Sequence, residues 1–506
     1  MQTNTTLLSL LNFILKIQIA QNKKVIFMLS KIQICRLILF IFFIVSQNIS
    51  TAQTKVWNLK ECIDEAIAKN LNIGNAMLTA ENSSINVKQA QIGRLPNLNA
   101  QLGHNFQFGR SIDPSTNQFL QQNIQSNNVG LSSSVVLFNG FQQNNIIRQN
   151  RLNYEAGKYD VEKVKNDVML QVTSNYLQII LNQEILENAI IQQSNTATQS
   201  TRTERLVAAG SIPELNLFQI KSQLANDKLA VARAENQVTL SKVALMQTMN
   251  MPVSATFEIQ KTEIPEPEIT ATTLSSTEDI YTTAIQNQPQ IKSAEGRVNS
   301  AMMGVRVAKG AYLPRLMLSA NISSFYSNAN KMMTVNGVRI QNVGYVTNDP
   351  SQLVSSAVPN YSFNHYPFLQ QMKDKIGEQV MISLNVPIFN GRQVLSNVER
   401  NKVNSKIAQN NQQDIKNQLR QSIEQASADL RAAINNYNAS KEALSFSDAA
   451  YNNSDKRFNA GLMNTTDLLI QKNNLFSAKI NASQAKYDYF FKLKLLEFYQ
   501  GKAISF

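Results

Sequence analysis

Residue types that could carry chemistry are few in this sequence and do not cluster. His104 and His365 are the two histidines, and neither lies near Asp, Glu or Cys at the spacing of a metal site. We find no nucleophile motif and no glycine-rich phosphate loop. The methionine pairs 302–303 and 332–333 offer soft ligands, but flexible filling of apolar space is the commoner use of methionine. We therefore expect no catalytic residue, no metal site and no cofactor, and a protein that is not an enzyme.

The charge pattern argues against a nucleic-acid partner. The 506 residues carry a formal net charge of +13, but five of the basic residues precede Ala52 in a segment without a single acid. The other Lys and Arg residues are spread along the chain, without a basic block or interleaved aromatic residues. We expect no nucleic-acid binding.

Residues 1–52 are expected to be an upstream extension followed by a secretory signal peptide. The apolar run from Leu37 to Val45 follows Lys31 and Arg36 and precedes the small residues 50–52. This run is shorter than a membrane-spanning helix requires. Cys62 is then the single cysteine of the exported chain, which predicts a protein without an internal disulfide.

The chain contains two copies of one unit. The segment AIAKNLNIGNA at 66–76 matches AIQNQPQIKSA at 284–294, which is an offset of 218 residues. Further along, VVLFNG ending at Gly140 matches VPIFNG ending at Gly391, which is an offset of 251 residues. The second copy therefore has 33 additional residues between these two points. A repeat of this kind determines the architecture before any local assignment is made.

Each copy is expected to contain a helix, a strand, a loop, a strand, a long helix, a turn and a return helix. The first copy, 53–275, is predicted to have a helix at 59–93, strands at 97–109 and 127–138, a long helix at 141–208, a return helix at 214–250 and a linker at 251–275. The second copy, 276–506, is predicted to have a helix at 277–312, strands at 315–326 and 379–389 joined by a long extracellular loop at 327–377, a long helix at 392–459 and a return helix at 465–499.

The predicted strands alternate apolar and polar residues, as membrane β-barrel strands do. The first shows period 2 over about a dozen residues, with Leu98, Leu102 and Phe106 on one side. A soluble sandwich with one buried face is the alternative, but helices separate these strands. Four strands cannot close a barrel, and lipid tolerates no open sheet edge. Other copies of the chain must complete the sheet; if there are three, the barrel has twelve strands.

The long helices are too long for an ordinary compact core. At about 1.5 Å per residue each would reach ~100 Å, while a return helix covers roughly half of that. We expect antiparallel coiled coils in which two short helices placed end to end match one long helix; a solid helical bundle would need a broader apolar stripe. Both strand-to-helix junctions read Phe-Asn-Gly. Asn139 and Asn390 are expected to be N-caps, and Gly140 and Gly391 to allow the change of direction.

The duplicated layout, the VPIFNG junction and the turns AAGSIPELNLFQIKSQL and NAGLMNTTDLLIQKNNL together resemble the TolC family of outer-membrane efflux channels. The resemblance covers residues 57–500. It implies a mainly α protein with membrane β: a homotrimer whose twelve-stranded barrel in the cell outer membrane continues into an α-helical tunnel in the periplasm. It also implies that the end of the tunnel docks a periplasmic adaptor, or membrane fusion protein, connected to an inner-membrane pump.

The resemblance also assigns residues at the two turns between long and return helices. Residues in the position of an adaptor-docking notch are Ala209, Gly210, Ser211, Ala460, Gly461 and Leu462. The alternative for each glycine is a plain helix C-cap. Asp467 matches the acidic position at the narrowest point, and its alternative is a first-turn carboxylate stabilised by the helix dipole. Asn216 is its equivalent in the first copy.

The positions that close the channel in some members of this family differ here. Phe458 and Met463 stand where those members have a tyrosine and an arginine, and Ile470 stands at a second acidic position. A closed end would then depend on apolar packing and hydrogen bonds.

The function implied by the resemblance is a trimeric outer-membrane exit duct that passively conducts small molecules from the pump and adaptor to the exterior. Type I protein secretion is an alternative within transport. A non-pore coiled-coil envelope protein, or a surface receptor built on the loop at 327–377, is an alternative of another class. The sequence does not identify the substrate.

Overall fold

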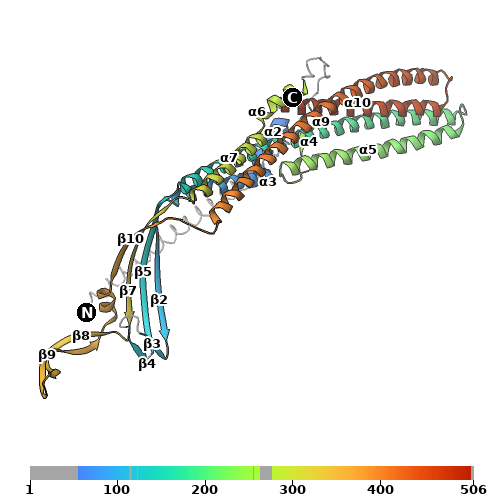
Figure 1. The fold of residues 1–506 in the computed structure, drawn as a ribbon. Coiled ribbons are helices and arrows are strands. Elements are labelled where there is room, and N and C mark those ends of the chain that lie inside the picture. Colours follow the sequence, from blue (N-terminus) through green and yellow to red (C-terminus); the bar gives the residue numbers. More distant parts are fainter. Residues whose placement is uncertain (1–54, 113–116, 122, 255, 262–275, 503–506) are drawn as a thin grey trace, which may run out of the picture. The chain divides into compact units, whose positions relative to one another are not determined.

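The computed structural model describes residues 55–112, 117–121, 123–254, 256–261 and 276–502 (Figure 1). The expected signal segment 1–52 and the linker residues 262–275 lie outside the described residues. The described residues divide into two compact units, one within 55–58 and 254–260 and the other within 59–253 and 261–502. In the smaller unit, β1 (Val56–Trp57) pairs in parallel with β6 (Glu258–Ile259).

The larger unit holds the other elements. Its helices are α2 (Leu59–Lys69), α3 (Leu71–Ile92), α4 (Gln142–Ala208), α5 (Glu214–Thr248), α6 (Thr277–Asn287), α7 (Pro289–Gly310), α8 (Phe368–Asp374), α9 (Gln393–Asn459) and α10 (Thr465–Tyr499). Its strands are β2 (Asn97–Gln107), β3 (Arg110–Ile112), β4 (Phe119–Gln121), β5 (Ile124–Asn139), β7 (Arg315–Ser327), β8 (Lys331–Val346), β9 (Asp349–His365) and β10 (Gly377–Asn385). No helix in the described part of the chain is long and apolar enough to cross a membrane.

Four strands form one antiparallel sheet in the order β10, β7, β5, β2. The register pairs Leu102 with Val129 and Val380 with Ala320. Because cross-strand partners lie on the same face, the apolar residues of all four strands gather on one side of the sheet. This side is exposed in the single chain, with 79% of the Leu102 surface and 74% of the Val380 surface accessible. Within the described residues, β10 and β2 are open edges.

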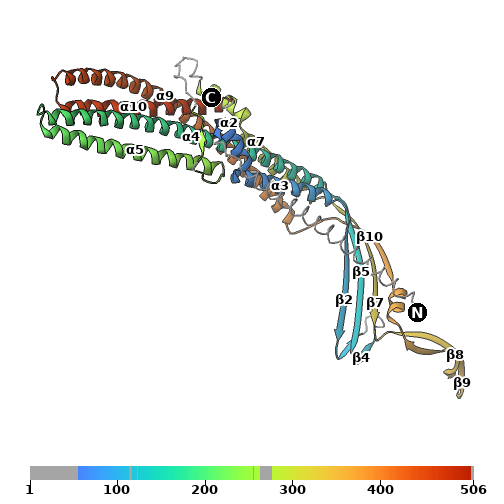
Figure 2. The same cartoon turned by 180° about the vertical axis from the view of Figure 1, so that it is seen from behind.

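The helices next to the sheet repeat the order of the strands. α3 contacts α4, α4 contacts α7, and α7 contacts α9 (Figures 1 and 2). α3 precedes β2, β5 precedes α4, α7 precedes β7, and β10 precedes α9. The helix layer α9–α7–α4–α3 therefore matches the sheet order β10–β7–β5–β2 and ends at the same two edges.

The two long helices each fold back on a return helix. α4 and α9 are 67 residues long, without an internal proline, and pair with the 35-residue helices α5 and α10 (Figure 1). The end of α5 meets the start of α3, because Asn70 Nδ2 donates to the Thr248 carbonyl at 2.8 Å and Asn250 Nδ2 to the Lys69 carbonyl at 3.2 Å. Two short helices thus follow one another along one long helix.

An apolar core between α9, α10, α6 and α7 stabilises the second copy. It includes the buried side chains of Ile423, Leu430 and Tyr489, together with Ile280 from α6. The rings of Tyr437 and Tyr489 are stacked, with centroids 6.1 Å apart. The predicted fold class, long antiparallel helices with a smaller sheet built from a duplicated unit, is confirmed by this arrangement.

The predicted single helices at 59–93 and 277–312 are each two helices. Asn70, between α2 and α3, has extended backbone angles, and its side chain accepts a hydrogen bond from Asn72 N as an N-cap. Gln288, between α6 and α7, is also extended, because the ring of Pro289 disfavours helical angles at the residue before it. The two breaks are 218 residues apart, which is the offset of the repeat.

The expectation that Asn139 and Asn390 are N-caps is wrong. The structural N-caps are Phe141 and Arg392, with φ of 61° and 65°, and neither makes a side-chain capping bond. Two successive residues in the left-handed region, Gly140 or Gly391 and the next residue, turn the chain from strand to helix, which moves the helix start beyond the asparagine.

The predicted long loop at 327–377 is largely ordered secondary structure. β8 and β9 form an antiparallel hairpin, and α8 follows it. Alternating apolar residues explain the hairpin, since Met333 pairs with Phe363 and Val335 with Tyr361 on one face. The predicted strand at 379–389 also ends early, at Asn385, two residues before Pro387, which has no N–H for the ladder.

Candidate functional site

The two turns at 209–213 and 460–464, called the tips below, end the long helices with the same backbone motif. At the first tip, Ser211 N donates to the Leu206 carbonyl and Gly210 N to the Val207 carbonyl, both at 2.9 Å. Gly210 has φ of +70°. The same bonds recur at the second tip around Gly461, with φ of +73°. This is the Schellman C-cap, in which glycine adopts the left-handed conformation with little strain.

The residues assigned to adaptor docking are accessible at the tips. Six of them are exposed in the single chain: Ala209, Gly210, Ser211, Ala460, Gly461 and Leu462. A Cβ atom added at Gly210 or Gly461 would meet no heavy atom within 4 Å. Both glycines therefore lie on open surface that a partner could approach closely.

The start of α10 is fixed by Asn464, a residue that sequence inspection did not single out. Its side chain accepts from Asp467 N at 2.8 Å, and its Nδ2 donates to Asp467 Oδ2 at 2.9 Å. Asp467 is therefore exposed in the first turn of the helix, where its charge is favoured by the helix dipole. The equivalent residue Asn216 lies in the first turn of α5, which begins after Pro213 without a side-chain cap.

The other residues predicted to close the channel end differ in their exposure. Phe458 and Met463 are half-buried, while Ile470 is 50% exposed.

The helices α4 and α5 form one helical hairpin, and α9 and α10 form the other. Hydrogen bonds between these two helical hairpins hold the tips side by side. Arg202 Nη1 on α4 donates to Asn459 Oδ1 at the end of α9 at 2.5 Å, and Thr466 Oγ1 on α10 donates to Gln219 Oε1 on α5 at 3.3 Å. All four groups belong to exposed or half-buried polar residues. The tips of the two repeats are thus linked by solvent-accessible hydrogen bonds.

Farther from the tips, a buried polar network joins three helices. Lys472 Nζ on α10 donates to Thr196 Oγ1 on α4 at 2.7 Å, and Thr196 Oγ1 in turn donates to Asp227 Oδ2 on α5. Gln223 Nε2 donates to the other Asp227 oxygen at 2.7 Å. Lys472 and Asp227 are only 6% and 5% exposed. Burial lowers the pKa of the Lys472 ammonium below its usual 10.5, and the Asp227 charge opposes this shift.

A second polar cluster joins α10 to α4, farther from the tips than the Lys472 network. Glu184 Oε1 accepts from Ser483 Oγ at 2.6 Å, and Glu184 Oε2 accepts from the Tyr487 hydroxyl at 2.8 Å. Burial, followed by this hydrogen bond, raises the pKa of the Tyr487 phenol above its usual value. The second hairpin is therefore attached to the first through two sets of buried polar contacts.

Comparison with known proteins gives the family. The sequence model described as outer membrane efflux protein matches residues 62–251 and 280–499, which is most of both copies. This chain belongs to the outer membrane efflux protein family. The predicted membership in the TolC family of channels, the outer-membrane location and the absence of an enzymatic role are confirmed by this assignment.

Curated members of the outer membrane efflux protein family are similar at low identity. The pyoverdine export outer membrane protein OpmQ of Pseudomonas aeruginosa is 26% identical over 53% of this chain, which spans 56% of OpmQ. The outer membrane efflux protein BepC of Brucella suis is 20% identical over 71% of this chain and 69% of its own length. This chain thus spans between about half and two thirds of these relatives.

Solved structures of two membrane channels share the fold. The CmeC outer membrane channel of Campylobacter jejuni superposes with a TM-score of 0.65 at 17% identity, covering 88% of this chain and 85% of CmeC. CusC superposes with a TM-score of 0.64 at 16% identity, covering 90% of this chain and 96% of CusC. At these identities the likeness establishes the fold.

In this outer membrane efflux protein, sequence reasoning missed the Lys472 network because its members lie on three distant helices. A signal was nonetheless present. Asp227 lies midway between the buried residues Ile220 and Ala234 at heptad spacing, and Lys472 lies between the buried Leu468 and Leu475. A charged residue on an otherwise apolar seam indicates a buried polar contact with a neighbouring helix.

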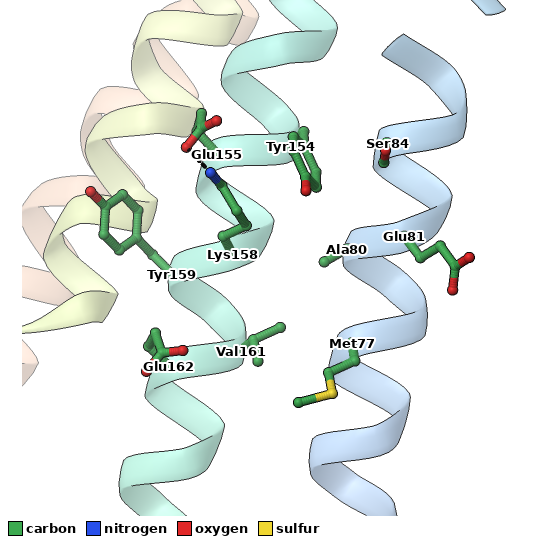
Figure 3. Close-up of a pocket in the computed structure, with 10 residues that line it drawn as sticks. All are labelled: Met77, Ala80, Glu81, Ser84, Tyr154, Glu155, Lys158, Tyr159, Val161 and Glu162. Atoms are coloured by element: carbon green, nitrogen blue, oxygen red, sulfur yellow. Dashed lines mark ion pairs between the residues drawn. The ribbon is translucent and has the colours of Figure 1, made fainter. Parts of the chain in front are cut away.

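A groove between α3 and α4 has no arrangement of residues that suggests chemistry. It has a volume of about 490 Å³, and Met77 and Ala80 on α3 face Val161 on α4 (Figure 3). At its rim, Lys158 forms an ion pair with Glu155 at 2.5 Å, and this hydrogen bond raises the pKa of Lys158. Among the described residues no group of three or more His, Cys, Asp or Glu side chains could hold a metal ion.

Proposed function

We propose that three copies of this chain form an outer-membrane exit duct, through which small molecules supplied by an inner-membrane pump and a periplasmic adaptor leave the cell passively. The observation that supports this most strongly is the shared order of sheet and helix layer. Both end at the same two edges, so a neighbouring copy placed at the β10 and α9 edge can extend the sheet and the helix layer together.

The exposed apolar face of the sheet supports the proposed placement in lipid. Leu98, Ile382 and Leu384 are each more than 60% exposed in the single chain, on the face opposite to the polar residues of the same strands. An apolar face that extends over four strands is stable only when other apolar groups cover it. Three sheets of four strands would give a closed twelve-stranded barrel with lipid outside and a polar interior.

The direct test of the duct is export in cells. Deleting this chain while leaving the pump and adaptor intact should raise susceptibility to at least one exported compound, and the wild-type chain should restore resistance. Since no nucleotide-binding motif is found in the sequence, energy would come from the partner pump. If the deletion leaves the export of every candidate small molecule unchanged but abolishes secretion of a protein, the function is protein secretion and not efflux.

The proposed docking role of the tips predicts a selective loss of export when they become bulkier. Asn tolerates the left-handed conformation, so Gly210→Asn with Gly461→Asn should keep the turns folded while filling the open space at both tips. We expect loss of export with normal amounts of protein in the outer membrane, measured by susceptibility assays and immunoblotting.

The matched control is Gly337→Asn. Gly337 also has positive φ (78°) and no heavy atom within 4 Å of an added Cβ, but it lies in the β8–β9 hairpin away from the tips. Normal export by the double tip variant would show that the tips do not receive the adaptor.

A further inference from the structure

Helix α8 lies on the apolar face of the sheet, the face that surrounds the barrel in the proposed assembly. It contacts β7, and the ring of Phe368 packs edge-on against Tyr326 with centroids 5.0 Å apart. Beneath it, a cavity of about 310 Å³ is lined by Val129, Leu131, Ile322, Met372, Lys373 and Ile376, among others. α8 therefore covers the side of the sheet on which lipid is expected.

Polar contacts fix α8 to the end of β7. Gln371 is fully buried, and its side-chain oxygen accepts from Ser327 N at 2.7 Å while its Nε2 donates to the Ser327 carbonyl at 3.1 Å. Ser324 Oγ donates to the Met372 carbonyl. These bonds satisfy backbone groups of β7 and α8 without water, as a position beside hydrocarbon requires.

The height of α8 along the sheet matches the border of a membrane. Ile322 lies seven residues along β7 from Arg315, the end nearest the helix layer. At about 3.3 Å per residue this is ~23 Å along the strand, and roughly 18 Å along the barrel axis for a strand tilted by about 40°. The apolar band of an outer-membrane barrel is about 25 Å tall. α8 thus lies near the outer limit of that band.

The outward surface of α8 is apolar with a mixed-charge margin. Leu369 is 79% exposed and Phe368 41% exposed, although both belong to a helix packed on the sheet. Lys373 is also exposed, and the neighbouring Asp374 accepts a hydrogen bond from the Tyr366 hydroxyl at 2.8 Å. Apolar side chains beside charged and aromatic ones are typical of segments at the lipid headgroup level.

We propose that α8 is a membrane-interface element, in which Leu369 enters the acyl region of the outer leaflet and Lys373 lies at the level of the lipid phosphate groups. The occupant of this surface is lipid, because the apolar sheet face on which α8 is packed continues directly into it. This inference depends on the proposed function, in which the same face of the sheet borders lipid.

The test uses tryptophan fluorescence in lipid vesicles. The chain has one tryptophan, so each probe is introduced into full-length Trp57→Phe protein. The probes are Leu369→Trp, Ile382→Trp on the apolar face of β10 and Gln341→Trp in the β8–β9 hairpin. Each purified protein is reconstituted in phosphatidylcholine vesicles whose acyl chains are brominated either near the headgroup or near the chain end.

With bromine near the headgroup, Leu369→Trp should lose at least as much fluorescence as Ile382→Trp. With bromine near the chain end, Leu369→Trp should lose less fluorescence than Ile382→Trp. Gln341→Trp should respond to an aqueous quencher instead. Quenching of Ile382→Trp but not of Leu369→Trp would overturn the role of α8 and leave the duct intact. If neither the brominated lipids nor the aqueous quencher reduces the fluorescence of Leu369→Trp, protein covers this residue, which also overturns the role of α8. If neither brominated lipid quenches the fluorescence of Ile382→Trp, the sheet does not lie in lipid, and the role of α8 is overturned with it.

Discussion

Replacing Asp227 by alanine is expected to lower the free energy of unfolding of the tip half of the hairpins by about 3–5 kcal/mol. The substitution leaves the ammonium group of Lys472 buried without its counter-charge, and it removes the side-chain acceptor of Thr196, whose hydroxyl keeps the Gln192 carbonyl within 3.0 Å. The free energy needed to open these helices locally would fall by a similar amount. Amide hydrogens of α10 near Lys472 should therefore exchange about 10²–10³ times faster, as measured by hydrogen exchange with mass spectrometry.

Two control variants separate this charge effect from a general effect of substitution. Glu235→Ala removes an exposed carboxylate from the same helix and should change exchange little. Asp227→Leu combined with Lys472→Met replaces both charges by apolar groups and should restore most of the protection. Equal exchange in Asp227→Ala and Glu235→Ala would show that the network does not stabilise the hairpins.

The second large effect is expected at the first strand-to-helix junction. A Cβ atom on Gly140 would lie 2.1 Å from the Gly310 carbonyl oxygen and 2.9 Å from Leu313 Cβ, and the residue has φ of +64°. Gly140→Ala would therefore force the backbone of β5 away from the end of α7. We expect a loss above about 4 kcal/mol, seen as little folded protein in thermal unfolding followed by circular dichroism.

The equivalent residue in the other copy provides the matched control. Gly391 has nearly the same φ, +60°, but an added Cβ would meet nothing within 4 Å in the chain. Gly391→Ala should cost only the left-handed strain, about 1–2 kcal/mol. A similar loss in both variants would show that backbone strain, rather than close approach to Gly310, determines the effect.

The internal repeat allowed much of the fold to be predicted from the sequence. A constant offset of 251 residues relates the long helices, and the structure gives both a length of 67 residues. The alternating residues of β2 and β7 identified the sheet, because period 2 is a strong signal over a dozen positions. The order of the strands, and its repetition in the helix layer, required the structure.

The misassigned elements depended on short-range effects. Pro289 could have indicated the break before α7, but Asn70 breaks the first copy with a capping bond that competes with helical continuity. At the junctions, the side chain of Asn139 does reach Gln143 N at 3.3 Å, yet two left-handed residues separate it from the helix start. Sequence patterns identify residue types suited to a cap more easily than the position at which the cap occurs.

The site was predicted less completely than the fold. The positions of Gly210 and Gly461 at helix ends followed from their spacing, and both have the expected left-handed conformation. The Lys472 network was missed because the contact between α10, α4 and α5 joins residues 31 to 276 positions apart. Only the packing of the two hairpins brings these groups together.

Native mass spectrometry of the detergent-extracted wild-type protein tests whether three copies of this chain assemble into one duct. In the proposed duct, the edges at β10 and β2, open within the described residues, are closed by other copies of the same chain. A trimeric duct should give one dominant assembly containing three chains. A dominant monomer, or an assembly completed by a different protein, would contradict it.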